Sequence, residues 1–228
     1  MMYKCFLIFS ILSFNISAGQ ELKTVNIFEN QYNKITYKLF QDKLDFFSLN
    51  NIENSNSENI IRFWNTSNCI QLEKSKNFIS GKIIFVIQNS DNKLEFLRKE
   101  ISLSENQINE ILKIIADYKL DQLPTEENIK KWKTGFDGHL YEIELLINKK
   151  YQFKSYWTPE IQDNPEGKLL VNLKNNIEKI VNISNLFKEF ISENKFPCYK
   201  YYGTSYSICT IYTKKETRRL KRNARKMK

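Results

Sequence analysis

The sequence predicts an α+β protein, a two-layer sandwich in which an antiparallel sheet of about five strands packs against two or three helices on one side. Two observations lead to this class. Strand-like segments come in two consecutive pairs, at residues 82–101 and 141–157, with one further strand at 60–64. Segments with the apolar period of a helix lie between and after these pairs.

The strand at 82–87 is apolar on both faces, as expected at the centre of a sheet. Residues 88–92 are typical of a turn, and residues 93–101 alternate well enough to be the partner strand. The expected register places Leu94 opposite Ile87 and Phe96 opposite Phe85.

Start signals and apolar periods predict three helices. Ser104 and Gln107 match a capping box, in which the serine oxygen accepts the backbone N–H of residue 107 and the glutamine reaches back. The helix that they begin has an apolar face made of Ile108, Ile111, Leu112 and Ile115. A second helix is expected from about Glu166, and a third, capped by Ser184, ends before Pro197.

Residues 141–157 predict a hairpin whose register decides which side chains meet. A two-residue loop would set Glu144 opposite Phe153, a poor match, whereas a three-residue loop sets Glu144 opposite Lys154 and Tyr141 opposite Trp157. A slip of one residue would move each side chain to the opposite face of the sheet, so the better side-chain matches favour the register with the three-residue loop. Residues 136–138 and 158–160 then meet at one end of the hairpin.

Residues 1–19 have the features of a secretory signal peptide. Lys4 precedes an apolar run from Cys5 to Phe14, and the small residues Ser17 and Gly19 suit a cleavage site. The alternative is a buried amphipathic start of the fold. The run is too short to cross a bilayer and no other stretch approaches that length, so no transmembrane span is expected after signal removal.

We therefore expect an exported protein. Frequent Asn, Lys and Ile are typical of an AT-rich genome, and a bacterial source makes the protein periplasmic or extracellular. Residues 20–58 are expected to be a polar N-terminal extension, 59–213 a single α+β domain and 214–228 a basic tail. The 228 residues suffice for one domain with a sizeable core.

The net charge of +9 lies almost entirely in the tail. Residues 214–228 hold nine basic residues and one acidic residue, which gives +8; Lys4 adds +1, and the remaining 25 basic and 25 acidic residues cancel. Such a tail can bind an anionic envelope surface, although export argues against nucleic acid; the alternative is a solvated helical tail without a partner. The candidate contacts are Arg218, Arg219, Lys221, Arg222 and Arg225.

The cysteines predict one disulfide. Cys69, Cys198 and Cys209 remain after signal removal, in a compartment that permits disulfides. A two-residue turn at Gly203 and Thr204 places Cys198 opposite Cys209, on a hydrogen-bonded site of the ladder where side chains lie farther apart. We expect the Cys198–Cys209 bridge and a free Cys69.

The end of the predicted hairpin gathers five candidate ligand-binding residues: Trp132, Asp137, His139, Trp157 and Glu160. Aromatic and ionisable side chains at one sheet edge can form a binding rim. The alternative is structural: Asp137 and Gly138 form a turn, and the residues before Pro159 an extended strand exit. No nucleophile motif, phosphate loop or metal-ligand spacing is present, so no catalytic residue, cofactor or metal is expected.

Glu142 and Glu144 lie two residues apart on one strand face, so their carboxylates could approach within the roughly 5–9 Å that glycosidase pairs use. The alternative is a cross-strand ion pair between Glu144 and Lys154 on the solvated face.

The same segment resembles a pattern of short exported bacterial proteins of unknown function. Those proteins show Asp-Gly, an aromatic three positions later, a glutamate three further on, a tyrosine-histidine pair and an Arg-Trp-Ser-Pro exit. The matching residues are Asp137, Gly138, Tyr141, Glu144, Tyr151, Trp157 and Pro159. Gln152 and Tyr156 stand where the histidine and the arginine would be. The resemblance spans about residues 80–195 and implies no activity.

These observations favour an exported, non-catalytic module that binds a protein or a small molecule, of which a periplasmic inhibitor or immunity-type protein is one form. One alternative is a hydrolase that uses Asp137, Glu142, Glu144 or Glu160. Another is an envelope-associated protein held to anionic surfaces by its tail.

Overall fold

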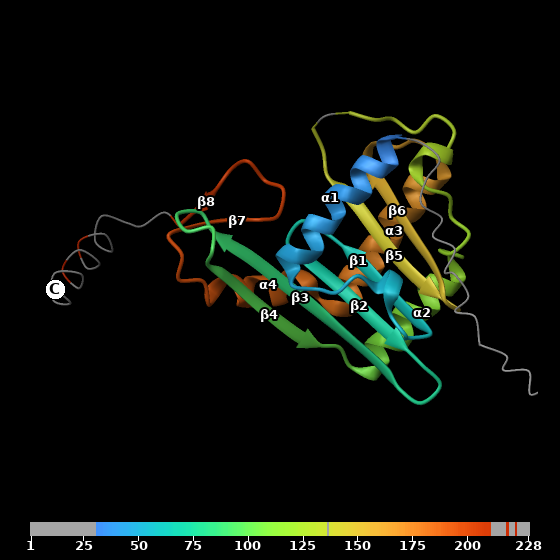
Figure 1. Cartoon of the computed structure of the whole chain (residues 1–228), viewed down its shortest axis with the longest axis horizontal. Coiled ribbons are helices and arrows are strands. Elements are labelled where there is room, and N and C mark those ends of the chain that lie inside the picture. Colours follow the sequence, from blue (N-terminus) through green and yellow to red (C-terminus); the bar gives the residue numbers. More distant parts are fainter. Residues whose placement is uncertain (1–30, 136, 211–217, 219–221, 223–228) are drawn as a thin grey trace, which may run out of the picture.

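The computed structural model describes residues 31–135, 137–210, 218 and 222, and over these residues an open antiparallel sheet lies between helices on both faces (Figure 1). The helices are α1 (Gln31–Phe47), α2 (Glu105–Asp117), α3 (Pro165–Val181) and α4 (Ile183–Ser192), with short 3₁₀ turns η1 (Ile52–Asn54), η2 (Glu126–Asn128) and η3 (Pro159–Ile161). The strands are β1 (Asn59–Trp64), β2 (Asn68–Lys74), β3 (Ile79–Asn89), β4 (Phe96–Ser102), β5 (Leu140–Ile147), β6 (Lys150–Trp157), β7 (Cys198–Lys200) and β8 (Ile208–Cys209).

The α+β class is confirmed, but the sheet is larger than predicted. The described residues form an eight-stranded sheet. Seven strands follow the order β6-β5-β1-β2-β3-β7-β8, and the eighth, β4, lies off this path and pairs with β3. The prediction of about five strands missed β2, whose mixed sequence hides a central strand between β1 and β3. It also did not count β7 and β8, the strands of the predicted Cys198–Cys209 hairpin, as members of this sheet.

The three predicted helices do lie on one face, but the predicted two-layer architecture is wrong because each face of the sheet carries its own core. One face packs against α2, α3 and α4, with Ile70, Phe85 and Ile143 pointing to that side. The opposite face packs against α1, with Cys69, Ile84 and Val86 pointing there. The alternation of side chains along each strand therefore separates two apolar cores, and the architecture has three layers rather than two.

Helix α1 corrects the expectation that residues 20–58 form a polar N-terminal extension outside the domain. Its Phe40, Leu44 and Phe47 are buried against the sheet. The ring of Phe40 lies edge-on to Trp64 at 5.2 Å between centroids, which is a favourable aromatic geometry. Polar residues between these three had concealed the apolar stripe, and the segment belongs to the core.

The β5–β6 hairpin has a two-residue loop instead of the predicted three-residue loop. Asn148 and Lys149 both adopt positive φ, at 50° and 63°, as a type I′ turn requires. Glu144 therefore pairs with Phe153, not with Lys154, and Trp157 with Leu140 rather than Tyr141. The predicted register was wrong because Glu144 points into the α1 core, where distant residues provide its hydrogen bonds.

The β3–β4 register also differs from the prediction. Phe96 pairs with Gln88, and Leu94 lies in the turn. The turn is closed by the N–H of Glu95, which donates to the carbonyl of Asn92 at 3.0 Å. The connection spans residues 90–95 instead of the predicted 88–92, and it leaves the Leu94 side chain in solvent.

The helix signals near Ser104 and Glu166 are confirmed, and one cap is corrected. The Ser104–Gln107 capping box is present at the start of α2. Asn182, with a φ of 58°, both ends α3 and begins α4, so Ser184 is not the cap. Ser184 instead donates its N–H to Glu178 at 2.8 Å.

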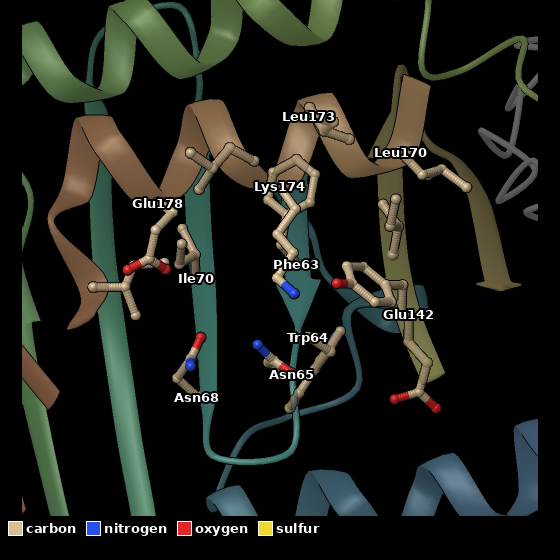
Figure 2. Close-up of a pocket in the computed structure, with 14 residues that line it drawn as sticks. Phe63, Trp64, Asn65, Asn68, Ile70, Glu142, Leu170, Leu173, Lys174 and Glu178 are labelled. Atoms are coloured by element: carbon tan, nitrogen blue, oxygen red, sulfur yellow. The ribbon is translucent and has the colours of Figure 1, made fainter. Parts of the chain in front are cut away.

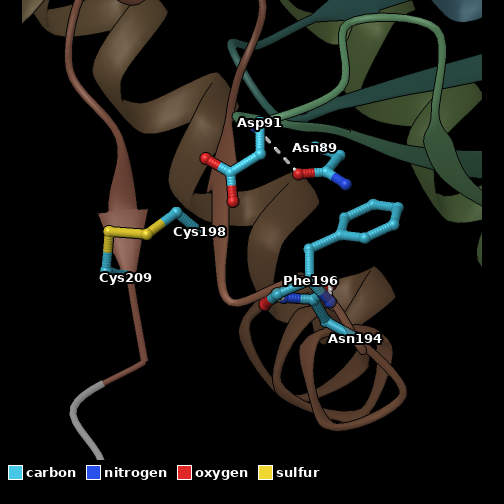
Figure 3. The surroundings of a disulfide bond; sticks show 6 residues. All are labelled: Asn89, Asp91, Asn194, Phe196, Cys198 and Cys209. Atoms are coloured by element: carbon cyan, nitrogen blue, oxygen red, sulfur yellow. Dashed lines mark hydrogen bonds between the residues drawn. A yellow bond between two sulfur atoms is a disulfide. The ribbon is translucent and has the colours of Figure 1, made fainter. Parts of the chain in front are cut away.

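The Cys198–Cys209 disulfide is confirmed (Figure 3). The N–H of Thr210 donates to the carbonyl of Pro197 at 2.9 Å, so the cysteines form a non-hydrogen-bonded pair with a Cα–Cα distance of 4.0 Å. The loop is longer than the predicted two residues, which moves the pair onto this closer site. Cys69 is free and fully buried, and burial raises its pKa to about 12.

Candidate functional site

A cleft of about 60 Å³ lies between α3 and the open ends of β1, β2 and β5 (Figure 2). Apolar side chains form most of its walls: Phe63, Ile70, Ile143, Leu170, Leu173, Ile177 and Ile183. Polar side chains surround its mouth: Asn65, Asn68, Tyr141, Lys174 and Glu178. The cleft follows from the sequence of α3, because leucine and isoleucine at helical spacing face the sheet while Lys174 and Glu178 reach its rim.

Beside the mouth, four ionisable side chains from three elements form a connected group. The carboxylate of Glu160, in η3, accepts a hydrogen bond from the hydroxyl of Tyr141 on β5. It also pairs with Lys174 Nζ of α3 at 3.1 Å and with His139 Nε2 at 3.0 Å. Lys174 Nζ lies 4.8 Å from the centre of the Tyr141 ring, within cation–π range. Glu160 is thus the anion that joins the hairpin end to α3.

The charge state of this group follows from its contacts. Partial burial acts to raise the pKa of Glu160, but hydrogen bonds from Tyr141, its own backbone N–H and Lys174 outweigh it and lower that pKa to about 2. Burial, reinforced by the neighbouring Glu160, raises the pKa of Tyr141. At neutral pH the carboxylate is ionised and the phenol is protonated, so the group holds a stable charge pattern at the cleft rim.

The structure brings only some of the predicted rim residues together. His139 and Glu160 are in contact, whereas Asp137 is exposed. Trp157 packs under the preceding turn so closely that a Cβ on Gly135 would lie 2.7 Å from its ring and one on Gly138 would lie 2.6 Å from its Nε1. Only glycine, which has no Cβ, permits this close approach. The contact supports the interpretation that Asp137 and Gly138 form a structural turn.

Trp132 belongs to a different group, which sequence reasoning missed. Its ring lies 5.8 Å from that of Tyr156, beside Glu126. Glu126, only 2% exposed, accepts the backbone N–H of Trp157. Burial outweighs this hydrogen bond and raises the pKa of Glu126 to about 7. Nothing in the local pattern Thr-Glu-Glu-Asn marks this residue, because its burial arises from the chain folding over β6.

The raised pKa of Glu126 predicts a pH-dependent stability. The folded protein binds this proton more tightly than the unfolded chain, so the contribution is complete below about pH 4.5 and is lost as the pH rises to about 7. Urea unfolding should show a fall of at most about 3 kcal/mol over this range, at about 1.4 kcal/mol per pKa unit. Glu126→Gln should flatten this part of the profile. Glu110→Gln, on the exposed side of α2, is the control, and equal profiles for wild type and Glu126→Gln would contradict the assignment.

The carboxylates considered for catalysis lie on the other face of the sheet. Glu142 pairs with Lys43 of α1 at 2.6 Å, and Figure 2 shows its carboxylate pointing away from the cleft. Glu144 is fully buried and accepts hydrogen bonds from Arg62 at 3.3 Å, Trp64 at 2.9 Å and Tyr151 at 3.0 Å. The two therefore share a face, as predicted, but α1 covers both.

Other predicted sites are described only in part. Arg218 and Arg222 of the tail are exposed, while Arg219, Lys221 and Arg225 lie outside the described residues, as does the segment 1–19. Among residues that the structure describes, no group of three His, Cys, Asp or Glu side chains could hold a metal ion. Within the same residues, no helix combines the length and hydropathy of a membrane span.

No protein-family model matches this chain, and no curated protein matches it. The resemblance to short exported bacterial proteins stays a prediction.

Proposed function

We propose that this protein is an exported, non-catalytic binding module that takes an apolar side chain of a partner protein into the cleft beneath α3. The main support for this proposal is the volume of the cleft. At about 60 Å³ it is far smaller than the roughly 300–1,000 Å³ of small-molecule sites, but it can accept the end of an aliphatic side chain. Lys174 and Asn65 at its mouth offer hydrogen bonds to the partner backbone. A periplasmic inhibitor or immunity-type protein is one form of such a module.

Two features support export. Residues 1–19 have the pattern of a secretory signal, and Cys198 and Cys209 are positioned for a disulfide, which persists in oxidising compartments.

The carboxylates support binding over hydrolysis. Glu142 and Glu144 are engaged in ion pairs on the α1 face of the sheet, and although Glu142 contributes to the cleft lining, its carboxylate points away from the cleft to Lys43. Glu160 meets three donors and has a pKa of about 2, which makes it a poor proton carrier near neutral pH. Asp137 is exposed and stands apart from the cleft lining.

The proposal predicts that filling the cleft removes the partner. Ile183 lines the cleft at the start of α4, and Ile183→Trp should displace an inserted side chain. Lys188→Trp, at an exposed position on the same helix, is the matched control. Native mass spectrometry of each protein purified from its own envelope should show a stoichiometric protein partner on wild type and Lys188→Trp, and its loss on Ile183→Trp. Retention of that partner by Ile183→Trp, or an unbound wild type, would reject the proposal.

A further inference from the structure

We propose that the end of the molecule formed by the β3–β4 turn and the β7–β8 hairpin docks on an anionic phospholipid surface, with Leu94 and Phe96 as apolar contacts and residues 214–228 as the electrostatic contact. This surface is separate from the cleft beneath α3, and the inference is independent of the proposed partner protein.

The apolar contact consists of two exposed side chains, Leu94 and Phe96, and the Phe96 ring packs against α1. Leu94 is 89% exposed in the β3–β4 turn, and Phe96 is 44% exposed where β4 begins. The Phe96 ring lies 5.2 Å from that of Phe46 on α1, which in turn lies 5.4 Å from Tyr202. The aromatic support holds Phe96 at the surface, so its transfer into a lipid interface needs no rearrangement.

The neighbouring hairpin adds an uncharged surface. Residues 201–207 contain no charged side chain, and Tyr206 is 61% exposed. β7 pairs with the end of β3, and the N–H of Ser90 donates to the carbonyl of Cys198 at 3.0 Å, so the β3–β4 turn and β7 lie side by side (Figure 1). Tyrosine is enriched at membrane–water interfaces because its ring is apolar and its hydroxyl is polar.

The basic segment starts from this same end. β8 ends at Cys209, which the disulfide ties to Cys198. Residue 214 is five positions further on, so it lies within about 18 Å of Cys209 in any conformation. From there, residues 214–228 carry nine basic side chains and one acidic side chain, and Arg218 and Arg222 are exposed.

An anionic phospholipid surface is the ligand that suits both the apolar contact and the basic tail. The turn itself carries Asp91, Lys93 and Glu95, so it does not attract an anionic surface, and the attraction must come from the tail. Each basic residue near anionic lipid contributes about 1 kcal/mol. The strength of binding to a membrane interface grows with the apolar area buried there and with the attraction of basic residues to anionic lipid, and this end supplies both.

Vesicle sedimentation of the purified protein tests the inference. Vesicles of phosphatidylcholine with phosphatidylglycerol should bind it, and vesicles of phosphatidylcholine alone should not. The double variant Leu94→Ser/Phe96→Ser should weaken binding about tenfold or more. Arg218→Glu/Arg222→Glu should weaken it at least about tenfold. The matched control is Phe78→Ser, because Phe78 is 50% exposed in the β2–β3 turn at the other end of β3.

A second measurement reports insertion directly. The emission of L94W should shift to the blue on anionic vesicles, whereas that of F78W should not. Equal binding by wild type and Leu94→Ser/Phe96→Ser, with no shift for L94W, would show that the tail acts alone. Failure of wild type to bind the anionic vesicles would reject the lipid surface and leave a protein as the occupant of this end.

Discussion

Replacing Glu144 with leucine is expected to lower the free energy of unfolding by about 3–5 kcal/mol, the usual cost of breaking a buried ion pair from one side. The carboxylate accepts hydrogen bonds from Arg62, Trp64 and Tyr151, and α1 seals it from water. Burial raises the pKa of Glu144, and the guanidinium of Arg62 opposes that shift. Without the carboxylate, the buried charge of Arg62 loses its partner.

Urea unfolding of two further variants separates the ion pair from general disruption. Arg62→Met combined with Glu144→Leu should recover part of the loss, because the unpaired charge is then gone. Glu100→Gln removes the partly exposed ion pairs with Lys82 and Arg98 and should cost less than about 1 kcal/mol. If Glu144→Leu costs no more than Glu100→Gln, the buried network that joins β5 to β1 and β6 does not stabilise the fold.

Lys154→Met is expected to lower the free energy of unfolding by about 3 kcal/mol and to loosen the chain that covers β6. The buried ammonium of Lys154 donates to the carbonyls of Leu120, at 2.7 Å, Asp121, at 3.0 Å, and Leu123. Burial lowers the pKa of Lys154 to about 8, so it is mainly charged at neutral pH. Methionine fills a similar volume but leaves the three carbonyls without this donor.

Hydrogen exchange should locate this effect. In Lys154→Met, amides of residues 118–135 should exchange faster, while those of α1 should keep their protection. Lys150→Met, at an exposed position on the same strand, should change the stability by less than about 0.5 kcal/mol. Unchanged exchange in residues 118–135 would mean that the three hydrogen bonds do not hold this segment.

Features with a local physical cause were predictable from the sequence. The capping box at Ser104 is complete within four residues. The apolar period of α3 and the long apolar run of β3 likewise need no distant partner. The pairing of Cys198 with Cys209 followed from counting outward along one hairpin, although the turn between them has another length.

Features that depend on distant partners were not predictable. The sequence predicted that His139 and Glu160 lie at the same end of the hairpin, and they are in contact. It did not predict Lys174 or the cleft, since α3 packs beside the hairpin only in the folded chain. Glu126 was missed for the same reason.

The sequence by itself determined where α2, α3, strand β3 and the disulfide form, because side-chain period, capping and turn chemistry act over a few residues. Only the tertiary structure decided which strand face is buried and what each inward carboxylate meets. Glu144 is an example. The alternating pattern of β5 predicted a solvated residue opposite Lys154, whereas hydrogen bonds from Arg62 and Trp64, some eighty positions earlier in the chain, make its burial favourable. A polar residue facing inward is stable only where such partners converge, and that convergence is a property of the whole fold.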